Sequence, residues 1–196
     1  MADGREGETL AEKVARVVAE RVEVVEYDPR WQGMFEAERE HLRACLPGDL
    51  VGRIEHFGST AVEGLAGKPI VDMLVEVFDL ERVKREVAGV LEGQGYEYFW
   101  RPTWGDDGDP FYAWFIKRDG EGRRTHHIHM VEPGFEHWER LLFRDYLREH
   151  VEVAGEYAEL KRRLEREHGG ARVAYTEAKG EFIRRVTERA RGYYGG

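Results

Sequence analysis

The chain has 196 residues, of which 41% are hydrophobic and 35% are charged, so it can build a core beneath a densely ionic surface. Thirty basic and 39 acidic side chains give a net charge of −9 at pH 7, which argues against a long nucleic acid as partner. One cysteine excludes an internal disulfide, and no apolar run approaches the roughly 20 residues of a membrane span. We therefore expect a cytoplasmic protein that does not bind membranes.

Helices and strands alternate through the first two-thirds of the sequence. The predicted helices span residues 9–20, 31–46 and 79–91. The predicted strands span residues 22–27, 51–57, 70–78, 96–101, 111–117 and 124–132. Thr9, Asp28 and Asp79 have the residue types that cap helix N-termini. The turn at Asp119-Gly120 indicates that the last two strands form a β-hairpin.

The last third of the chain is predicted to be helical. Its expected helices span residues 135–149, 151–168 and 173–193. Strands that come early and helices that come late indicate an α+β fold, with a mixed sheet of about five or six strands and helices packed on it. We expect a disordered tail over residues 1–8 and one domain over residues 9–196, sheet-rich in 22–132 and helical in 135–193.

A candidate phosphate-binding loop follows the strand at 51–57. Gly58 allows a sharp turn, and Ser59 and Thr60 present two hydroxyls near backbone N–H groups, a combination that suits phosphate oxygens. Lys68, later in the same loop, adds a positive charge for a phosphate. The structural alternative is a tight turn with an exposed lysine.

The next strand carries a candidate metal ligand. Twelve residues separate Ser59 from Asp72, and strand alternation places Asp72, Leu74 and Glu76 on one face. This spacing resembles the nucleotidyltransferase pattern, in which two carboxylates hold Mg²⁺ (or Mn²⁺) against a triphosphate. Leu74 stands where that pattern has its second carboxylate, so either Glu76 substitutes for it or the metal site is absent.

The segment GSTAVEGLAGKPIVD (residues 58–72) resembles the GrpB family, whose fold is nucleotidyltransferase-like. Further matches to that family are Tyr27-Asp28 with Trp31, HHIHMVE (126–132), FRDYLR (143–148), and the pairs Tyr157/Lys161 and Tyr175/Lys179. The resemblance covers about residue 22 to the C-terminus and implies a fold more firmly than a reaction. Relatives joined to dephospho-coenzyme A kinase imply a connection with nucleotide or coenzyme A metabolism.

Two histidines are candidate catalytic residues. His127 and His129 share one face of the strand at 124–132, and His126 faces the other side, where a structural role is expected. Imidazoles two apart can share a metal, act as an acid–base pair or donate to a phosphate. We predict that Asp72, His127 and His129 are catalytic, and that Asp72, Glu76 and His129 bind the metal.

The helical third adds two candidate phosphate contacts, Arg144 and Lys179. Lys179 shares a helix face with Tyr175. The alternatives are an internal ion pair between Arg144 and Asp145 and a lysine that reaches into water. Aromatic residues around the loop 104–110 could stack a base or ring, and the alternative is that most of them belong to the core.

Three functions remain open from the sequence. The first is binding of a nucleotide or other small phosphorylated ligand, with Mg²⁺-dependent nucleotidyl transfer to a small acceptor. The second is a catalytically degenerate module that binds a nucleotide or a coenzyme A-related phosphate, which agrees with Leu74. The third is a His-centred, metal-dependent phosphohydrolase.

Overall fold

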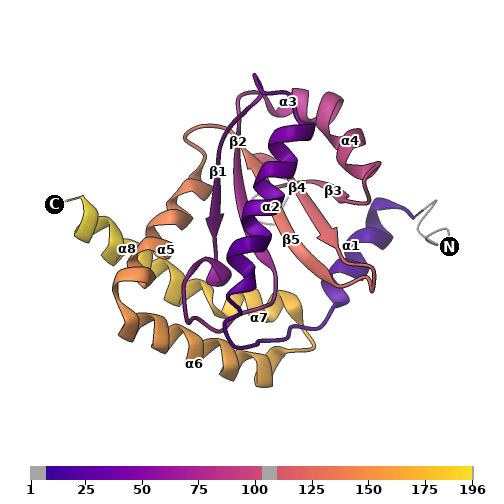
Figure 1. Cartoon of the computed structure of the whole chain (residues 1–196). Coiled ribbons are helices and arrows are strands. Elements are labelled where there is room, and N and C mark those ends of the chain that lie inside the picture. The colour runs from indigo at the N-terminus through magenta and orange to yellow at the C-terminus, as the bar shows by residue number, and fades with distance from the viewer. Residues whose placement is uncertain (1–7, 103–109, 196) are drawn as a thin grey trace.

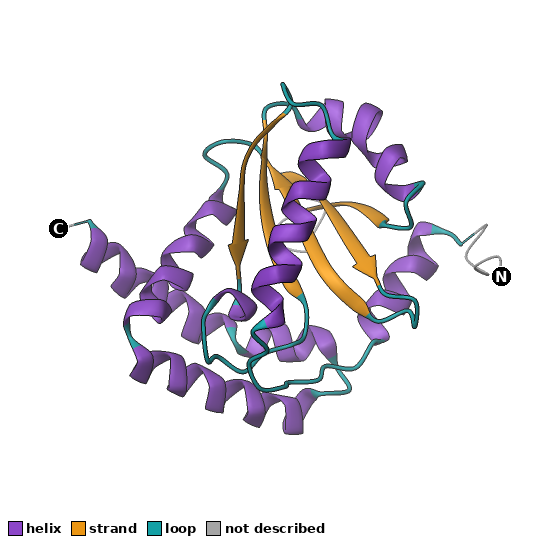
Figure 2. Cartoon of the chain, in the orientation of Figure 1, coloured by secondary structure: helices purple, strands orange, loops and turns teal. Residues whose placement is uncertain are grey.

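A computed structural model describes residues 8–102 and 110–195, and its centre is a five-stranded mixed sheet (Figures 1 and 2). The strand order is β1-β2-β5-β4-β3; β2 and β5 are parallel, and the other neighbours are antiparallel. The strands are β1 (Val51–Phe57), β2 (Val71–Val77), β3 (Glu97–Pro102), β4 (Phe111–Arg118) and β5 (Arg124–Val131). The predicted α+β class with a mixed sheet is confirmed.

Helices flank the sheet and make up the last third of the chain. They are α1 (Leu10–Ala19), α2 (Arg30–Cys45), α3 (Leu80–Arg82), α4 (Ala88–Glu92), α5 (Arg140–Glu149), α6 (Val151–His168), α7 (Arg172–Ala178) and α8 (Gly180–Tyr194). Shorter turns are η1 (Ser59–Ala61), η2 (Val83–Val87) and η3 (Glu136–Glu139). None of the helices in the described residues is long and apolar enough to cross a membrane.

Two of the three predicted helix caps are present, whereas α2 has Pro29 and not Asp28 at its N-cap, without a capping hydrogen bond from a side chain. Thr9 forms a capping box with Glu12 at the start of α1, and Asp79 accepts a hydrogen bond from the Arg82 N–H at 2.9 Å. The helix predicted over residues 173–193 is instead divided into α7 and α8, with Lys179 at the junction. Gly180 follows the junction, and glycine is a weak helix former.

The strand predicted at residues 22–27 is wrong. Val25 forms one isolated antiparallel bridge with Gly67, with N···O distances of 2.9 Å in both directions. The Val22 N–H instead donates to the Gly169 carbonyl at 2.8 Å, and the Val24 N–H donates to Glu165 at 2.9 Å. Residues 22–25 therefore do not join the sheet. They connect the loop after β1 to the C-terminal end of α6.

The two faces of the sheet have different coverings. On one face α2, α3 and α4 bury an apolar core, whose members include Trp31, Phe35, Leu42, Met73, Val75, Phe115 and Ile128. Burial of each such side chain contributes about 1.5–3 kcal/mol. The other face is covered by α1, η3 and α5, which contribute Val17, Trp138 and Leu141 to a smaller core around Leu74 and Trp114. Figure 1 shows α2 crossing the sheet on the side toward the viewer.

The loop after β1 packs on the C-terminal helices. Val62, Leu65 and Ala66 share a third apolar cluster with residues of α5, α6 and α8. This packing brings α6 beside the segment that the sequence predicts to bind phosphate. Residues 1–7 of the predicted tail and residues 103–109, which include most of the loop 104–110, lie outside the described ranges. Glu8, the last residue of that tail, forms an ion pair with the Arg16 guanidinium, with an N···O distance of 2.9 Å.

Candidate functional site

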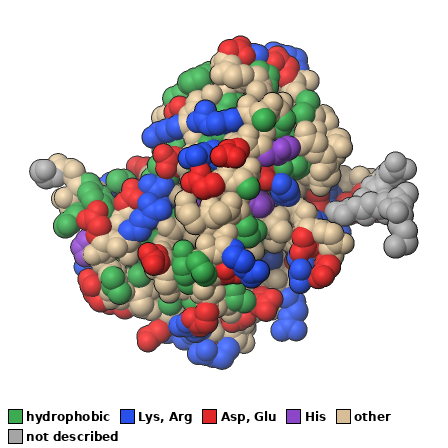
Figure 3. Space-filling view, in the orientation of Figure 1, with side chains coloured by type: hydrophobic (Ala, Val, Ile, Leu, Met, Phe, Trp, Pro, Cys, Tyr) green, Lys and Arg blue, Asp and Glu red, His purple; other side chains and the backbone are tan. Residues whose placement is uncertain are grey.

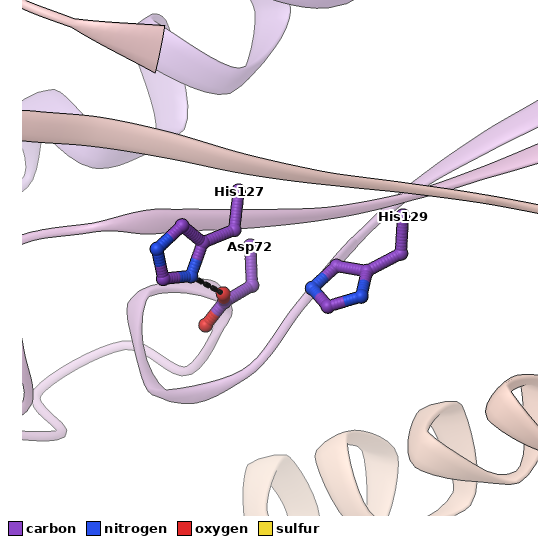
Figure 4. A group of neighbouring side chains, drawn as sticks. All are labelled: Asp72, His127 and His129. Atoms are coloured by element: carbon purple, nitrogen blue, oxygen red, sulfur yellow. Dashed lines mark hydrogen bonds and ion pairs between the residues drawn. The ribbon is translucent and has the colours of Figure 1, made fainter. Parts of the chain in front are cut away.

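Parallel pairing of β2 with β5 brings the predicted catalytic residues together. Asp72 is the register partner of His127, and Leu74 is the partner of His129. One donor atom from each of Asp72, His127 and His129 lies within 4.8 Å of the others. Figure 4 shows the three side chains turned toward one another from the two strands. The strand that carries both histidines, β5, therefore lies directly beside the strand that carries Asp72, β2.

His127 and Asp72 form a hydrogen-bonded pair. The His127 Nδ1 lies 3.1 Å from Asp72 Oδ1, and its Nε2 lies 3.4 Å from a guanidinium nitrogen of Arg124. Because Arg124 can only donate, Nδ1 carries the proton and donates it to Asp72. Burial lowers the pKa of His127 to about 4, although Asp72 opposes the shift. The imidazole is therefore neutral at neutral pH.

Asp72 stays ionised despite its position. Burial raises its pKa, but the hydrogen bond from His127 and the positive charges of Lys68 and Arg140 outweigh burial and lower the pKa below its usual value. Asp72 therefore provides a carboxylate to the site at neutral pH.

His129 is a buried imidazole without a hydrogen-bond partner among the described residues. Its ring stacks on Tyr112 with a centroid separation of 5.5 Å and meets the edge of Phe57 at 5.4 Å. Its Nδ1 is fully buried and unpaired. Burial lowers the pKa of His129 well below its usual value, so this ring is also neutral. Figure 4 shows Nδ1 on the side of the ring away from Asp72, and Nε2 on the side toward it.

The loop before Asp72 is folded tightly enough to require two glycines. Gly58 has φ +73°, and a Cβ there would lie 2.6 Å from Asp72 Oδ2. A Cβ on Gly67 would lie 2.6 Å from the Ser59 Cβ. These contacts place Ser59 between the turn at Gly58, which approaches the Asp72 carboxylate, and the end of the loop at Gly67.

A lysine from α6 completes this loop. The Lys161 ammonium donates to Ser59 Oγ at 2.8 Å and to the Ala66 carbonyl, and the side chain is only 2% exposed. Burial, with the nearby charges of Arg162 and Lys68, lowers the pKa of Lys161 to about 7. The sequence singles out the Tyr157/Lys161 spacing but not this hydrogen bond, because Ser59 lies 102 positions away.

Two further lysines lie near the same carboxylate. Burial lowers the pKa of Lys68 to about 8, and that of Lys179 falls well below its usual value through burial and the charges of Lys68 and Lys161. Asp72 is the acidic group that opposes both shifts. Within the described ranges, no carboxylate oxygen lies within 4.0 Å of any of these three ammonium groups. When protonated, the lysines thus form a cationic cluster that lacks enough negative charge, in keeping with their lowered pKa values.

Arg140 adds a positive charge that sequence patterns do not reveal. Its guanidinium lies 2.9 Å from His137 Nε2 and 5.6 Å from the Phe57 ring centroid. Burial lowers its pKa, and Asp72 is among the groups that oppose the shift. Figure 3 shows acidic and basic side chains interspersed over the face that it presents. The excess of cations around Asp72 is therefore a local property of the site in a chain whose net charge is −9.

Thr60 and Arg144, both predicted to contact phosphate, form hydrogen bonds with other residues of the chain. Thr60 is 2% exposed, accepts a hydrogen bond from His56 Nε2 at 2.9 Å and donates to the Ile70 carbonyl at 3.3 Å. Arg144 bonds to Asp145 at 2.7 Å, to Glu55 at 3.0 Å and to the His56 carbonyl at 2.8 Å. Their contacts with phosphate stay predictions, although these partners occupy the polar groups of both residues; the ion pair between Arg144 and Asp145 is confirmed.

Glu76, also predicted to bind the metal, is not in the group of donor atoms that Asp72, His127 and His129 form. It lies one strand period beyond Leu74, where its register partner is Val131, and its carboxylate is 3.3 Å from the Arg53 guanidinium. Leu74 itself is fully buried in the apolar cluster on this face. His126 lies on the opposite face, 3.4 Å from the Met34 carbonyl, in the structural role expected for it.

These positions do not fit the Mg²⁺ site of the nucleotidyltransferase pattern. Mg²⁺ takes oxygen ligands in octahedral geometry, usually one or two carboxylates with water and phosphate oxygens. Here one carboxylate stands with two imidazoles, and the position of the second carboxylate is apolar.

A cavity of about 520 Å³ lies near the same loop without including the Asp72 cluster. Its lining includes Thr60, Val62, Leu65, Arg148, Ala154 and Ala158. It offers no histidine and no lysine, so the cationic cluster and not this cavity is the candidate site.

Known proteins resemble this chain over most of its length. The family model described as GrpB protein matches residues 21–189. UPF0157 protein YqkA of Bacillus subtilis is 38% identical over 172 residues, covering 87% of this chain but 48% of YqkA, so the chain spans about half the length of that relative. UPF0157 protein PA4798 of Pseudomonas aeruginosa is 42% identical over 171 residues, covering 87% of this chain and 68% of the relative.

Two solved structures overlay on the fold. The crystal structure of conserved protein GrpB from Enterococcus faecalis has a TM-score of 0.76 and 35% identity, covering 89% of this chain and all of that one. A cytoplasmic RNA terminal U-transferase overlays with a TM-score of 0.42 and 18% identity, covering 70% of this chain and 43% of that one. The second likeness is too distant to indicate a shared activity.

Proposed function

The chain belongs to the GrpB family, and from this premise we propose that it binds a nucleotide or another small phosphorylated ligand on a nucleotidyltransferase-like fold. The phosphates would contact Ser59, Lys68, Lys161 and Lys179. The observation that carries the proposal is the hydrogen bond from Lys161 to Ser59, which fixes a buried ammonium in the Gly-Ser loop without a carboxylate partner among the described residues.

An anion with several negative charges is the ligand that this cluster lacks. Removing an ammonium from water costs several kcal/mol unless an opposite charge compensates. Asp72 supplies one negative charge against three lysines. A phosphate or polyphosphate supplies further charge and also accepts a hydrogen bond from the Ser59 hydroxyl.

Nucleotidyl transfer to a small acceptor is the reaction we propose for the site. The charge that develops on phosphate oxygens during transfer would be stabilised by lysines already fixed in the loop, on α6 and at the junction of α7 and α8. Asp72, next to the turn at Gly58, is the carboxylate nearest to that chemistry.

A module that binds the phosphate without transferring it is the second candidate. The fully buried Leu74 favours it, because this side chain occupies the position of the second metal carboxylate. A coenzyme A-related phosphate would suit such a module as well as a nucleotide, since both present phosphate groups to the lysines.

Thermal denaturation with a ligand panel tests the proposal. The panel contains the four NTPs, coenzyme A, dephospho-coenzyme A and pyrophosphate. A ligand at a hundred times its Kd raises the midpoint of a domain this size by about 5–10 °C. Lys161→Met should lose most of that rise, while Arg163→Gln, an exposed change on the same helix, should keep it. No stabilisation of the wild type by any phosphorylated compound, or an equal rise in Lys161→Met, would reject it.

Pyrophosphate release separates the two candidates. The leading candidate predicts release from one NTP in the presence of a hydroxyl-bearing acceptor. A ligand that stabilises the protein but is recovered unchanged under all these conditions identifies the binding module.

A further inference from the structure

The donor atoms of the site differ from the two carboxylates of the nucleotidyltransferase pattern. They are the carboxylate of Asp72 and the imidazoles of His127 and His129. We infer that these three residues bind a divalent first-row transition-metal ion, of the Zn²⁺, Fe²⁺ or Co²⁺ class, in preference to Mg²⁺. Two imidazoles and one carboxylate on two adjacent strands would hold the ion from one side. The remaining coordination positions would be free for water or a ligand oxygen.

The spacing of the donor atoms suits one ion. Transition-metal bonds to imidazole and carboxylate are about 2.0–2.2 Å long, so neighbouring donors on one ion lie about 2.9–3.5 Å apart. His127 Nδ1 and Asp72 Oδ1 are 3.1 Å apart. His129 completes a set in which every separation is at most 4.8 Å, and Figure 4 shows its ring turned toward the other two.

The second observation is that His129 has no hydrogen-bond partner in the described part of the chain, although only 7% of it is exposed. Figure 4 shows that the ring nitrogen turned toward Asp72 and His127 is Nε2, which also has no hydrogen bond among the described residues, so a bound metal ion would give this nitrogen a partner. The ring is also held in place by Tyr112, which stacks on it, and by Phe57. A side chain fixed before the ligand arrives loses little entropy on binding it.

The donor types decide which metal fits. Imidazole suits Zn²⁺, Fe²⁺, Co²⁺ and Ni²⁺, and two histidines with one carboxylate on one side of the ion are typical of open transition-metal sites. Mg²⁺ prefers oxygen donors and keeps its water, and the position that would supply a second carboxylate is the buried Leu74.

Binding at Nδ1 has a cost at His127. Once a metal occupies Nδ1, the proton moves to Nε2, which then faces a donor nitrogen of Arg124 at 3.4 Å. That contact is long, and Arg124 has stronger partners in Glu20, at 2.6 Å, and the Val17 carbonyl. Arg124 therefore remains anchored when it loses the contact with His127.

Titration of the metal-free protein with single metal ions tests the inference. The full chain is freed of metal with a chelator, and Zn²⁺, Co²⁺ and Mg²⁺ are titrated separately by calorimetry without any nucleotide. We expect one Zn²⁺ or Co²⁺ per chain, bound about a hundredfold more tightly than Mg²⁺. The visible spectrum of the Co²⁺ form reports nitrogen ligands directly.

Variants locate the site. His129→Ala and Asp72→Asn should weaken binding by about tenfold or more, whereas His126→Ala, on the opposite face of the same strand, should not. His129→Gln, with the circular dichroism of each metal-free variant, separates loss of a ligand from loss of folding. Absence of saturable Zn²⁺ and Co²⁺ binding, or equal binding in His129→Ala, would overturn the inference; the latter would point elsewhere, for example to Cys45 and His41, 3.9 Å apart.

Metal binding is tested independently of phosphate binding, because the titrations contain a metal ion and no nucleotide. Lys161→Met should bind Zn²⁺ as the wild type does. Metal binding without nucleotide binding would reject only the proposed function, and nucleotide binding without metal binding would reject only this inference.

Discussion

Lys161 in α6 donates a hydrogen bond to Ser59 in the loop after β1, at 2.8 Å and across 102 positions of the chain. The helical third therefore takes part in the candidate site as well as covering the sheet. The same lysine also bonds to the Ala66 carbonyl, so it holds both ends of the loop.

Ser59 and Thr60 are neighbours with opposite expected roles. Ser59→Ala should weaken the binding of the phosphorylated ligand by about tenfold, because it removes a hydroxyl beside the lysines. Thr60→Val should lower the free energy of unfolding by about 1–3 kcal/mol and leave affinity nearly unchanged, because His56 loses its buried partner. Urea denaturation and calorimetric titration of both variants measure the two effects. An affinity loss in Thr60→Val as large as that in Ser59→Ala would contradict this assignment.

Gly58 and Gly64 offer a matched test of the loop. Both have positive φ, of 73° and 74°, but a Cβ would lie 2.6 Å from Asp72 Oδ2 at Gly58 and in open space at Gly64. Gly64→Ala should therefore cost only the backbone strain, about 1–2 kcal/mol. Gly58→Ala should cost more and displace the Asp72 carboxylate. We expect a lower unfolding midpoint in Gly58→Ala, together with weaker metal binding, and two variants of equal stability and affinity would show that the close contact is unimportant.

The buried lysine predicts how stability depends on pH. The pKa of Lys161 is about 7 in the folded chain against 10.5 for an unperturbed lysine, so between these values the unfolded chain binds a proton that the folded chain does not. Stability from this group therefore rises with pH across that window, by at most about 1.4 kcal/mol per pH unit. Lys68, with a pKa of about 8, acts in the same direction.

Comparison with Lys161→Met isolates this contribution, because the other titrating groups largely cancel. The stability difference, variant minus wild type, should fall as the pH rises from 7 to 9.5, as measured by urea denaturation. A difference that does not vary with pH would mean that Lys161 titrates normally.

Substitution of Leu74 tests the effect of restoring the second carboxylate of the nucleotidyltransferase pattern. Leu74→Asp places a charge in an apolar cluster and should destabilise the metal-free protein by several kcal/mol, more than the uncharged Leu74→Asn. The new carboxylate would lie on the strand face of Asp72, so Mg²⁺ or Mn²⁺ should raise the unfolding midpoint of Leu74→Asp but not of Leu74→Asn. Equal responses to the ions in the two variants would argue against this placement.

The sequence alone determined most of the elements, and also which side of each strand carries the candidate site residues. Alternation along a strand is a local property, so the shared face of His127 and His129, and the opposite orientation of His126, could be read directly. The Gly-Ser turn and Asp72 were likewise visible, because a sharp turn and the strand that follows it are encoded by adjacent residues.

Only the tertiary structure decided which candidate site residues have polar groups available to a ligand, and which cationic side chains lie beside them. The parallel register of β2 and β5 pairs Asp72 with His127 over 55 positions, and nothing local encodes that register. Thr60 and Arg144 matched the expected pattern, but their groups are occupied by partners that only the packing provides. Lys161 and Arg140 join the site because helices distant in sequence pack on the loop and the sheet. The burial that lowers the pKa of both side chains exists only in the folded chain.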